Sequence, residues 1–563
     1  ALYLYQKLLN AQPDNSNYSF RLIKIQQELQ QFKAADSLIN GLLKKTKNPQ
    51  YLVELGYNFQ LQNQLETAKS YYNQALSQAY EMPALSYSIA LKFEEHSLVD
   101  QAIEVYVFAI ENTQNYSYEY RLAGLYAIKK DLENMFLSYL NFTAYNPNYK
   151  NQTLQLLSDY VSEDAANEYN RILKKIILKK LQTSSNVLWN QMLSWLFVQE
   201  KAYKRALAQE KAIFRRQQNS LQGVIEVALL AKANKVYEVT SDAFRFISNV
   251  AQEPKLSLEA ERQLLTLELL RNKAPDYKRI QFDYKHLLER YGIYNETIDL
   301  QLSYAEFLAF HYQQKQAAIL FLKKCLEVEA SKFTKAKLKL KLADILTTQE
   351  QFNRALVFYT QVHSQIKNST LAQQARFKSA KVSYYKGDFE WAETQLKVLK
   401  SSTSQLIAND ALDLQLLITD HKYGDSLQMP LKLYAKADFL QLQKKPKAAF
   451  KVLDTLTKAH PSHAIIDQAL MLQAQILESE ADYNGAAQKY HTILKDFSTE
   501  ILADDAYFAL AELQRKAFNA PEKALLLYEK IIFEHQDSIH FVDAKKHYRR
   551  LLELSNSSSK NDL

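Results

Sequence analysis

A spacing of small and aromatic residues recurs along the first 150 residues, and it constrains the fold more than any other feature of the chain. The stretch from Glu54 to Leu76, ELGYNFQLQNQLETAKSYYNQAL, shows it clearly. The spacing returns after 34 residues with every element matched, and again after 33 with two small residues enlarged. The matched sets are Gly56, Phe59, Ala68, Tyr72 and Ala75; Ala90, Phe93, Ala102, Tyr106 and Ala109; and Ala123, Tyr126, Met135, Tyr139 and Phe142. Repeats of this length predict stacked helix pairs that share one continuous core.

The same step can be taken towards the N-terminus. From Ala68 it reaches Ala34 and then Ala1, where Ala1, Tyr5 and Pro13 match the second helix and closing proline of a unit. We therefore expect the first unit to be truncated and the array to begin before residue 1.

The C-terminal half repeats the second-helix pattern with longer units. Ala355, Ala392, Ala449, Ala486 and Ala524 mark it, and the regular steps between them are 37 or 38 residues, about one helical turn more than before. The segment AKLKLKLADIL from Ala336 to Leu346 alternates like a strand. Its leucines at 338, 342 and 346 also share one helical face, so we predict a helix with solvated lysines.

Composition supports an all-α fold. The chain has only 8 Gly and 10 Pro among 563 residues, and tight hairpins and phosphate-binding loops depend on glycine at positive φ. No two glycines form G-x-G, and G-x-S-x-G is missing. These absences exclude a Walker loop, a dinucleotide fingerprint and a nucleophile elbow. The most apolar uncharged stretch, 187–199, is too short to span a membrane.

The repeat spacing resembles the tetratricopeptide repeat, which implies an α-solenoid whose first helices line a concave groove for a peptide or a partner helix. On this resemblance Gly56 and Ala90 allow close helix crossing, and Tyr72 and Tyr106 fill the space between units. The implied groove positions are Val53, Tyr57, Gln60, Tyr87, Leu91, Glu94, Tyr120 and Gly124. Such a wall would be aromatic and neutral, and it would lack the lysine and asparagine clamp of chaperone-binding members. Packing between units is an equal alternative role for the tyrosines.

Residues with catalytic potential are few. Lys174, Lys175, Lys179 and Lys180 form the densest basic stripe, which could contact phosphate or an acidic protein, or form a solvated face. The pair His460 and His463 falls at a junction and is better explained as a loop than as a metal site. We therefore assign no catalytic, cofactor-binding or metal-ligating residue, and we predict a protein that is not an enzyme.

A second resemblance lies in the C-terminal repeats. The segments IANDALDLQLL from Ile407, AIIDQALMLQAQIL from Ala464 and ILADDAYFALAEL from Ile501 share Asp or Asn shortly before a buried alanine. They resemble repeats of bacterial envelope proteins of the BamD and CpoB type and of large tetratricopeptide proteins of Bacteroidota. The resemblance implies a periplasmic scaffold associated with the outer membrane, in an assembly that inserts or secretes proteins.

The predicted organisation has five parts. They are an array over 1–150, divergent helical repeats over 151–300, a second array over 301–539, a capping helix over 540–554 and a disordered polar tail over 555–563. Other proteins are the expected partners, and no nucleic acid is expected. Peripheral membrane association, through partners or a lipid anchor upstream of Ala1, is compatible with this reading. A cytosolic adaptor and a cell-wall-acting enzyme are the alternatives.

Overall fold

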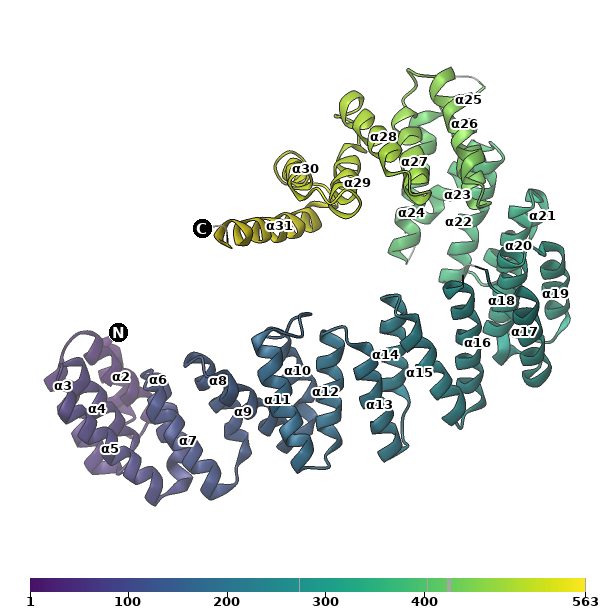
Figure 1. Cartoon of the computed structure of the whole chain (residues 1–563). Helices are drawn as coiled ribbons and strands as arrows, with labels where there is room; N and C mark the ends of the chain where they lie inside the picture. Colours follow the sequence, from purple (N-terminus) through teal and green to yellow (C-terminus); the bar gives the residue numbers. More distant parts are fainter. Residues whose placement is uncertain (273, 402–403, 423–426, 562–563) are drawn as a thin grey trace. The chain divides into compact units, whose positions relative to one another are not determined.

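The computed structural model describes residues 1–272, 274–401, 404–422 and 427–561, and within these ranges every regular element is a helix (Figure 1). The chain divides into two compact units, Ala1–Leu267 and Glu268–Leu563. The prediction of an all-α solenoid of the tetratricopeptide type is confirmed. The five predicted parts of the chain stay predictions, and the division by contacts lies between the boundaries predicted near 150 and 300.

The first unit consists of successive helix pairs. Its helices are α1 (Leu2–Ala11), α2 (Ser16–Glu28), α3 (Phe32–Thr46), α4 (Gln50–Leu61), α5 (Leu65–Glu81), η1 (Pro83–Leu85), α6 (Ser86–Glu95), α7 (Val99–Thr113), η2 (Tyr116–Tyr118), α8 (Glu119–Ile128), α9 (Leu132–Tyr145), η3 (Pro147–Tyr149), α10 (Lys150–Ser158), α11 (Glu168–Thr183), α12 (Val187–Gln199), α13 (Tyr203–Gln217), α14 (Gln222–Ala233) and α15 (Tyr237–Val250). The helix α16 (Pro254–Arg271) crosses the division between the units.

The second unit continues with longer helices. They are α17 (Tyr277–Tyr291), η4 (Asn295–Thr297), α18 (Ile298–Glu306), the π-helical turn η5 (Phe307–His311), α19 (Lys315–Glu327), α20 (Lys332–Thr348), α21 (Phe352–Gln365), α22 (Thr370–Tyr385), α23 (Phe389–Lys397), η6 (Val398–Ser401), α24 (Gln405–His421), α25 (Met429–Leu442), α26 (Pro446–Ala459), α27 (Ile466–Ser479), α28 (Tyr483–Asp496), α29 (Ala503–Lys516), α30 (Pro521–Glu534) and α31 (Phe541–Asn561).

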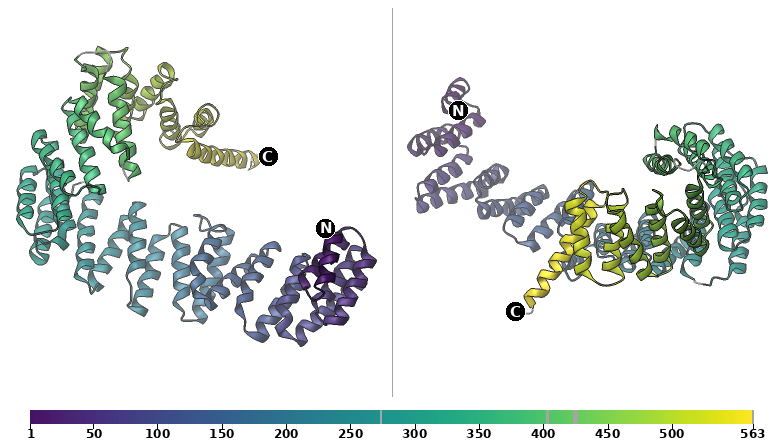
Figure 2. Two further views of the ribbon diagram at one scale, coloured as in Figure 1. Left: turned by 180° about the vertical axis from the view of Figure 1, so that it is seen from behind. Right: turned by 90° about the horizontal axis from the view of Figure 1, so that it is seen from above.

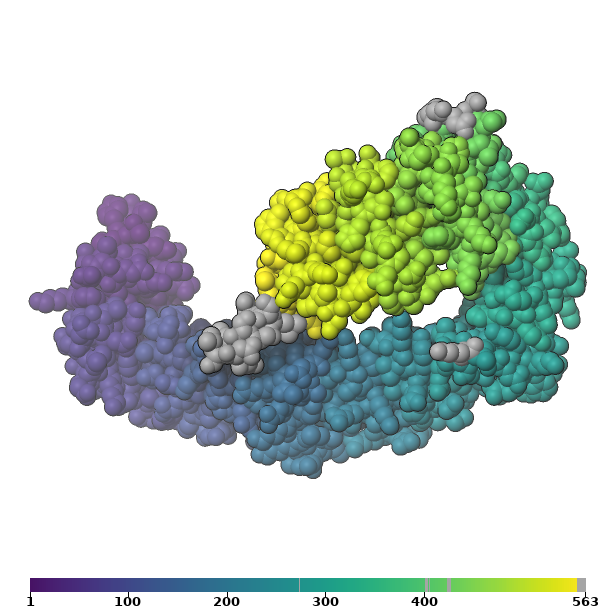
Figure 3. Space-filling view, turned by 45° about the horizontal axis from the view of Figure 1, so that its top comes forward, coloured from purple at the N-terminus to yellow at the C-terminus, as the bar shows by residue number. Residues whose placement is uncertain are grey.

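The helices of the first unit follow one another along the array, as the left view of Figure 2 shows. The first helix α4 contacts its own second helix α5 and also the next first helix α6. Second helices contact one another in the same way, α5 with α7 and α9 with α11. In the space-filling view of Figure 3 the side chains fill the gaps that the ribbons leave between these pairs. The small repeat positions lie at these contacts and are buried: Gly56, Ala68, Ala75, Ala90, Ala102, Ala109, Ala355, Ala392, Ala486 and Ala524.

A recurrent turn joins the two helices of a pair. In α4–α5 the residue Asn63 has φ 59°, the N–H of Gln64 donates to the carbonyl oxygen of Phe59 at 3.0 Å, and the N–H of Asn63 donates to that of Gln60 at 3.0 Å. These bonds define a Schellman motif, which satisfies carbonyl groups at a helix end. Left-handed residues stand at the same place in other pairs: Gln30, Ser97, Lys130, Lys201, Lys235, Gln313, Glu350, Gly387, Lys444, Ala481 and Asn519. The array therefore makes its turns almost without glycine, which explains how so few glycines suffice.

The middle region departs from this pattern for a local reason. The helices α10 and α11 are joined by residues 159–167 instead of the short turn, so the alanine spacing is lost there. In the second unit α24 stands between the pairs α22–α23 and α25–α26, which lengthens the step from Ala392 to Ala449. Divergent spacing thus reflects longer connections and an added helix within a helical array.

The segment 336–346, the helix α3 and the last helix were each the subject of a local prediction from the sequence. The strand-like segment 336–346 lies in α20, as predicted, and this helix is buried on more than one side, at Ala336, Leu338, Leu340 and Leu342. The buried alanine of α3 is Ala35, whereas the predicted Ala34 is exposed, so that unit is shifted by one residue. The last helix continues to Asn561 instead of ending at 554, since each further helical residue adds a hydrogen bond. Residues 562–563 of the predicted tail lie outside the described residues.

Candidate functional site

A basin with a volume of 980 Å³ lies where the first helices α2, α4 and α6 adjoin. Tyr5 of α1 also reaches it. The side chains around it are mostly aromatic, amide or charged: Tyr5, Ser16, Asn17, Tyr18, Phe20, Arg21, Lys24, Gln27, Glu28, Gln50, Glu54, Tyr57, Leu61, Leu91, Lys92, Glu95 and His96. Two predicted groove residues, Tyr57 and Leu91, are among them.

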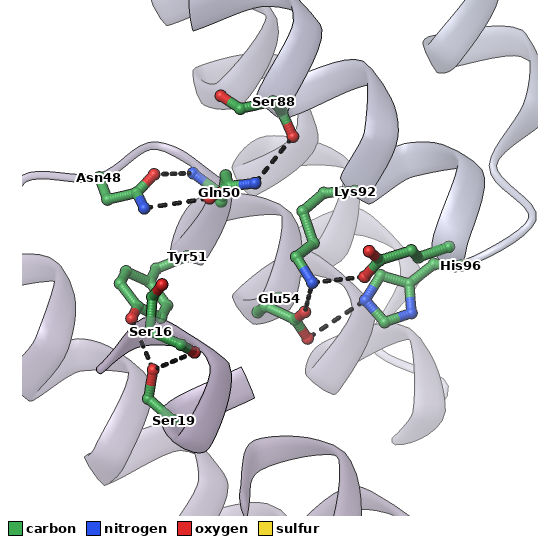
Figure 4. A network of polar contacts seen from close by, with 10 residues as sticks. Ser16, Ser19, Asn48, Gln50, Tyr51, Glu54, Ser88, Lys92 and His96 are labelled. Carbon is green, nitrogen blue, oxygen red and sulfur yellow. Dashed lines mark hydrogen bonds and ion pairs between the residues drawn. The ribbon is translucent and has the colours of Figure 1, made fainter. Parts of the chain in front are cut away.

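The buried carboxylate of Glu54 is the centre of the polar network in this basin (Figure 4). Its Oε1 lies 3.3 Å from Nζ of Lys92, and its Oε2 lies 3.1 Å from Nε2 of His96. Lys92 of α6 and His96, which caps the end of that helix, stand four residues apart, so they project from one side. Burial raises the pKa of Glu54, but the contacts with His96 and Lys92 outweigh burial, and the pKa lies below its ordinary value. The network therefore holds an ionised carboxylate where water is largely excluded.

Lys92 ties three successive first helices together. Its ammonium group pairs with Glu54 of α4, contacts Glu95 of α6 and lies 3.8 Å from the ring centre of Phe20 on α2. Phe20 in turn stacks on Tyr51 of α4 with a centroid distance of 4.9 Å. A cation over an aromatic face is attracted by the negative charge of that face. The floor of the basin is therefore fixed by contacts between helices that belong to different pairs.

Further hydrogen bonds fasten the rim of the basin, and Figure 4 shows them beside the charged network. The hydroxyls of Ser19 and Tyr51 lie 2.8 Å apart and join α2 to α4. The amide of Gln50 donates to the backbone oxygen of Ser88 at 3.0 Å and joins α4 to α6. These bonds leave the backbone of the three helices little freedom, so the basin is formed before anything enters it.

Tyr57 forms one wall of the basin. Its ring stacks on the imidazole of His96 with centroids 3.8 Å apart and an interplanar angle of 20°. The tyrosine is half-buried, so one part of the side chain packs on the network while the rest faces the basin. Both roles considered from the sequence, packing between units and lining the groove, therefore apply to this residue.

The remaining predicted groove residues lie elsewhere. Val53 is fully buried in the core, and Gln60 and Glu94 each accept a hydrogen bond from a tyrosine of their own pair. Tyr87 and Tyr120 are 38% and 41% exposed, and both rest against other tyrosine or phenylalanine rings: Tyr106, Tyr118, Tyr139 and Phe142. A Cβ added at Gly124 would meet no atom within 4 Å. The neutral groove wall stays a prediction, and the basin is lined by charged residues as well, including Lys92, His96 and three glutamates.

The tyrosine bonds form a repeated contact inside the helix pairs. Tyr72 donates to Gln60 at 2.9 Å, Tyr106 to Glu94 at 2.5 Å, and Tyr359 of the second unit to Asp344 at 2.6 Å. Tyr528 donates to Glu512 in the same manner. Two of these acids also pair with the next first helix, since Arg121 lies 3.6 Å from Glu94 and Lys378 lies 2.7 Å from Asp344. The repeated tyrosine therefore fills space and also orients an acid that links adjacent pairs.

The wall formed by α2 presents polar groups that the fold does not use. Arg21 and Lys24 are exposed, and among the described residues neither has an ion pair. Gln27 is only 5% exposed, and its Nε2 has no hydrogen-bond partner within the described structure. A buried amide without a partner is unfavourable. Arg21, Lys24 and Gln27 were not identified from the sequence. They belong to the unit of α2 and α3, whose buried alanine is displaced by one residue from the repeat spacing.

The predicted basic stripe of α11 separates into two faces. Lys174 lies 2.7 Å from the buried Glu200, and half-buried Lys180 donates to Asn141 at 2.6 Å. Burial lowers the pKa of Lys180. Lys175 and Lys179 are exposed, and Lys175 lies 3.3 Å from Glu133. The four lysines therefore do not form one patch.

Sequence reasoning missed the cations of α13. Residues 168–217, from the start of α11 to the end of α13, contain eleven lysines and arginines and three acidic residues. Their net charge of +8 equals that of the whole chain, so the rest of the chain has as many acidic as basic residues. A count of charge along the sequence is the signal that finds this region.

The histidine pair that the sequence offered as a possible metal site lies in a loop. His460 and His463 lie in the connection between α26 and α27, and Nδ1 of His463 accepts the N–H of Ile465 at 3.2 Å. In the part of the chain that the structure describes, no three His, Cys, Asp or Glu residues group as metal ligands would. Over the same residues, no helix combines the length and the apolar character needed to cross a bilayer.

Comparisons with known proteins give structural matches only. No protein-family model matches the chain, and no curated protein matches it significantly in sequence. The structure of Naa15/Naa10 bound to HypK-THB is 14% identical, covers 96% of this chain and 97% of that chain, and has a TM-score of 0.29. Yeast Tom70 is 14% identical, the match covers 89% of this chain and 99% of that chain, and the TM-score is 0.30. The APC/C hetero-tetramer Cut9–Hcn1 is 12% identical, with 97% of this chain and 98% of that chain covered and a TM-score of 0.23. Because these TM-scores are low, we base the site on the contacts of this chain alone.

Proposed function

We propose that this protein is a non-enzymatic scaffold that holds an extended segment of a partner protein in the basin of α2, α4 and α6. The observation that carries the proposal is the basin itself, a hollow of 980 Å³ on three successive first helices. Binding pockets for ligands span about 300–1,000 Å³, so this hollow has room for several side chains of a peptide.

The chemistry of the basin fits a peptide. Tyr57 and Tyr18 offer aromatic surface that loses little conformational entropy on binding. Asn17 and Gln50 offer amide groups, and Arg21 and Lys24 offer cations that the fold leaves unpaired in the described structure. Hydrogen-bonding groups interspersed with aromatic rings suit a chain with both a polar backbone and apolar side chains.

The rigidity of the floor supports the same conclusion. Lys92 and His96 are each already paired with Glu54, so the three side chains do not need to reorganise when a segment binds. A site that is formed in advance avoids part of the entropic penalty of association. We therefore expect the basin to bind without a large change in α4 or α6.

Site-specific photocrosslinking tests this proposal. A benzoylphenylalanine placed at Tyr57 is expected to crosslink to one partner, and peptide mapping should locate the adduct in a single segment of it. The control places the same group at Glu111, an exposed residue on α7 outside the basin. Equal crosslinking at both positions would show that contact with the basin is not specific.

We further propose that the scaffold works in a bacterial envelope assembly that inserts or secretes outer-membrane proteins. Support comes from the C-terminal signature at Ile407, Ala464 and Ile501, which resembles that of envelope repeat proteins. Fractionation of the native cell, combined with crosslinking from Tyr57, tests this step. Recovery of the protein and its adduct from the periplasmic or outer-membrane fraction is expected. Recovery from the cytosol alone would favour an adaptor with the same basin and overturn the envelope assignment.

A further inference from the structure

The helices α11 and α13 present a basic face that the proposed function does not use. Both are second helices that pack against α12, so their solvent-facing sides belong to the outer layer of the array. We define the basic face by Arg171, Lys175 and Lys179 of α11 and Lys204, Arg205 and Arg215 of α13, all of which are exposed. Within the described structure only Lys175 of these six has an ion pair, with Glu133. The chain therefore concentrates uncompensated positive charge on one surface.

Aromatic rings lie near Arg205 and Arg215 of this face and near Lys174 beside it. Lys174 and Arg205 lie 5.7 and 5.8 Å from the ring centre of Phe197 on α12, and Arg215 lies 5.9 Å from that of Phe246 on α15. A cation near an aromatic face gains attraction, which offsets part of the repulsion between like charges. Aromatic rings of α12 and α15 thus stabilise the cations that lie beside them on α11 and α13.

The surface between the cations carries few large apolar side chains. On α13 the residues between Lys204 and Arg215 on the solvent side include Ala208 and Ala212, whose side chains are small. Among the large hydrophobic side chains exposed in the described structure, Leu178 alone lies on α11–α13, and it stands between Lys175 and Lys179. A face of this kind lacks the apolar core of a protein interface, and within its described part it exposes no aromatic ring on which a base could stack.

We infer that the basic face binds an anionic membrane surface. Long, exposed basic side chains on two second helices of the outer layer can reach phosphate headgroups, and each lysine or arginine near such a surface contributes about 1 kcal/mol, or roughly five-fold in partitioning. Leu178 then meets the boundary between headgroups and acyl chains, with the stems of Lys175 and Lys179 beside it. This inference is independent of the basin, which lies on the first helices of other pairs.

Cosedimentation of the full chain with vesicles tests the inference. We expect binding to vesicles of phosphatidylglycerol and phosphatidylcholine, weaker binding as salt is added, and none to phosphatidylcholine alone. The variant Arg171→Gln/Lys179→Gln/Lys204→Gln is expected to lower the partition coefficient roughly 100-fold. The matched control, Lys33→Gln/Lys44→Gln/Lys69→Gln, removes three exposed lysines from the second helices α3 and α5 and should leave it unchanged.

Each result of the vesicle experiment either supports or overturns binding of the basic face to a membrane. If binding to anionic vesicles falls only in the variant of the basic face, and its thermal unfolding is unchanged, the membrane assignment is supported. Equal losses in both variants, or no binding of the native chain to anionic vesicles at low salt, overturns it. Tighter binding to polyglutamate or to duplex DNA than to the vesicles, at the same salt, also overturns it and assigns the face to an acidic protein or a nucleic acid.

Discussion

Gly56 and Tyr72 meet where α4 crosses α5, so closely that a Cβ at Gly56 would lie 2.3 Å from Cε1 of the tyrosine. Both residues are buried, and the hydroxyl of Tyr72 is held by Gln60. The ring has little room to withdraw, because Phe93 of the next first helix lies edge-on to it at 5.8 Å. A glycine at this position therefore serves close packing between the helices of a pair.

Gly56→Ala is expected to destabilise the protein by about 1–3 kcal/mol, as overpacking of a filled core does. Two other helical glycines are matched controls, since a Cβ at Gly41 or Gly124 would meet nothing within 4 Å. Alanine there should stabilise by up to about 1 kcal/mol through helix propensity. Urea denaturation and hydrogen exchange in α4 and α5 measure the difference. A stabilising Gly56→Ala would contradict the packing role.

Tyr57→Ala separates packing from binding. Loss of the stack on His96 is expected to reduce stability by about 1 kcal/mol, while capture of the partner in the basin should fall more strongly because exposed aromatic surface is lost. Tyr57→Phe keeps the ring and should leave the thermal midpoint unchanged. Crosslinking yield, with the photoreactive group moved to Leu91, reports binding in each variant. If both variants bind as the native chain does, the wall of the basin does not contact the partner.

Lys92 is expected to matter far more to stability than its neighbour Glu95. Lys92→Gln leaves the buried Glu54 with only His96, and removal of one partner from a buried ion pair costs about 3–5 kcal/mol. Glu95 is 49% exposed, and Glu95→Gln removes a surface pair worth at most about 1 kcal/mol. Parallel urea titrations of the two variants give the comparison. Equal losses would show that Glu54 does not depend on Lys92.

The stability of the second unit should depend on pH through Glu512. Burial raises the pKa of this carboxyl, but hydrogen bonds from Arg515, Lys516 and Tyr528 outweigh burial and lower it to about 2. Because the folded pKa lies below the unfolded one, the stabilisation is complete above about pH 5 and is lost as the pH falls towards 2.

The variant Glu512→Gln tests this linkage. It should be less stable than the native chain by about 1–2 kcal/mol at neutral pH, and the two should converge in acid. Hydrogen exchange in α29 and α30 measures the local free energy of opening at each pH. Glu534→Gln, at an exposed pair with Lys530, is the control. A difference that stays constant from neutral pH to acid would contradict the linkage.

The sequence predicts the helix pairs well but not the floor of the basin. The spacing of Gly56, Ala68 and Tyr72 depends only on contacts within a pair and between neighbours, which every unit repeats. The position of Lys92 depends on Phe20, which lies two pairs away, and no repeat period contains that relationship. Groove positions taken from the family use the repeat spacing alone. They placed Val53 in the groove although it is buried, and they did not include Glu54 beside it.

The repeated tyrosine bonds provide a graded test of how adjacent pairs are joined. Tyr106 donates to the charged Glu94, which also pairs with Arg121 of the next first helix, whereas Tyr72 donates to the neutral Gln60. Hydrogen bonds to charged groups contribute about 1.5–3 kcal/mol and neutral ones about 0.5–1.5. Tyr106→Phe should therefore destabilise more than Tyr72→Phe, although each removes one hydroxyl. Urea denaturation ranks the two variants, and hydrogen exchange in α8 should rise only for Tyr106→Phe, because only that bond orients an acid towards the next pair. No loss of stability in either variant would mean that the tyrosines act through packing alone, and a larger loss for Tyr72→Phe would contradict the predicted ranking.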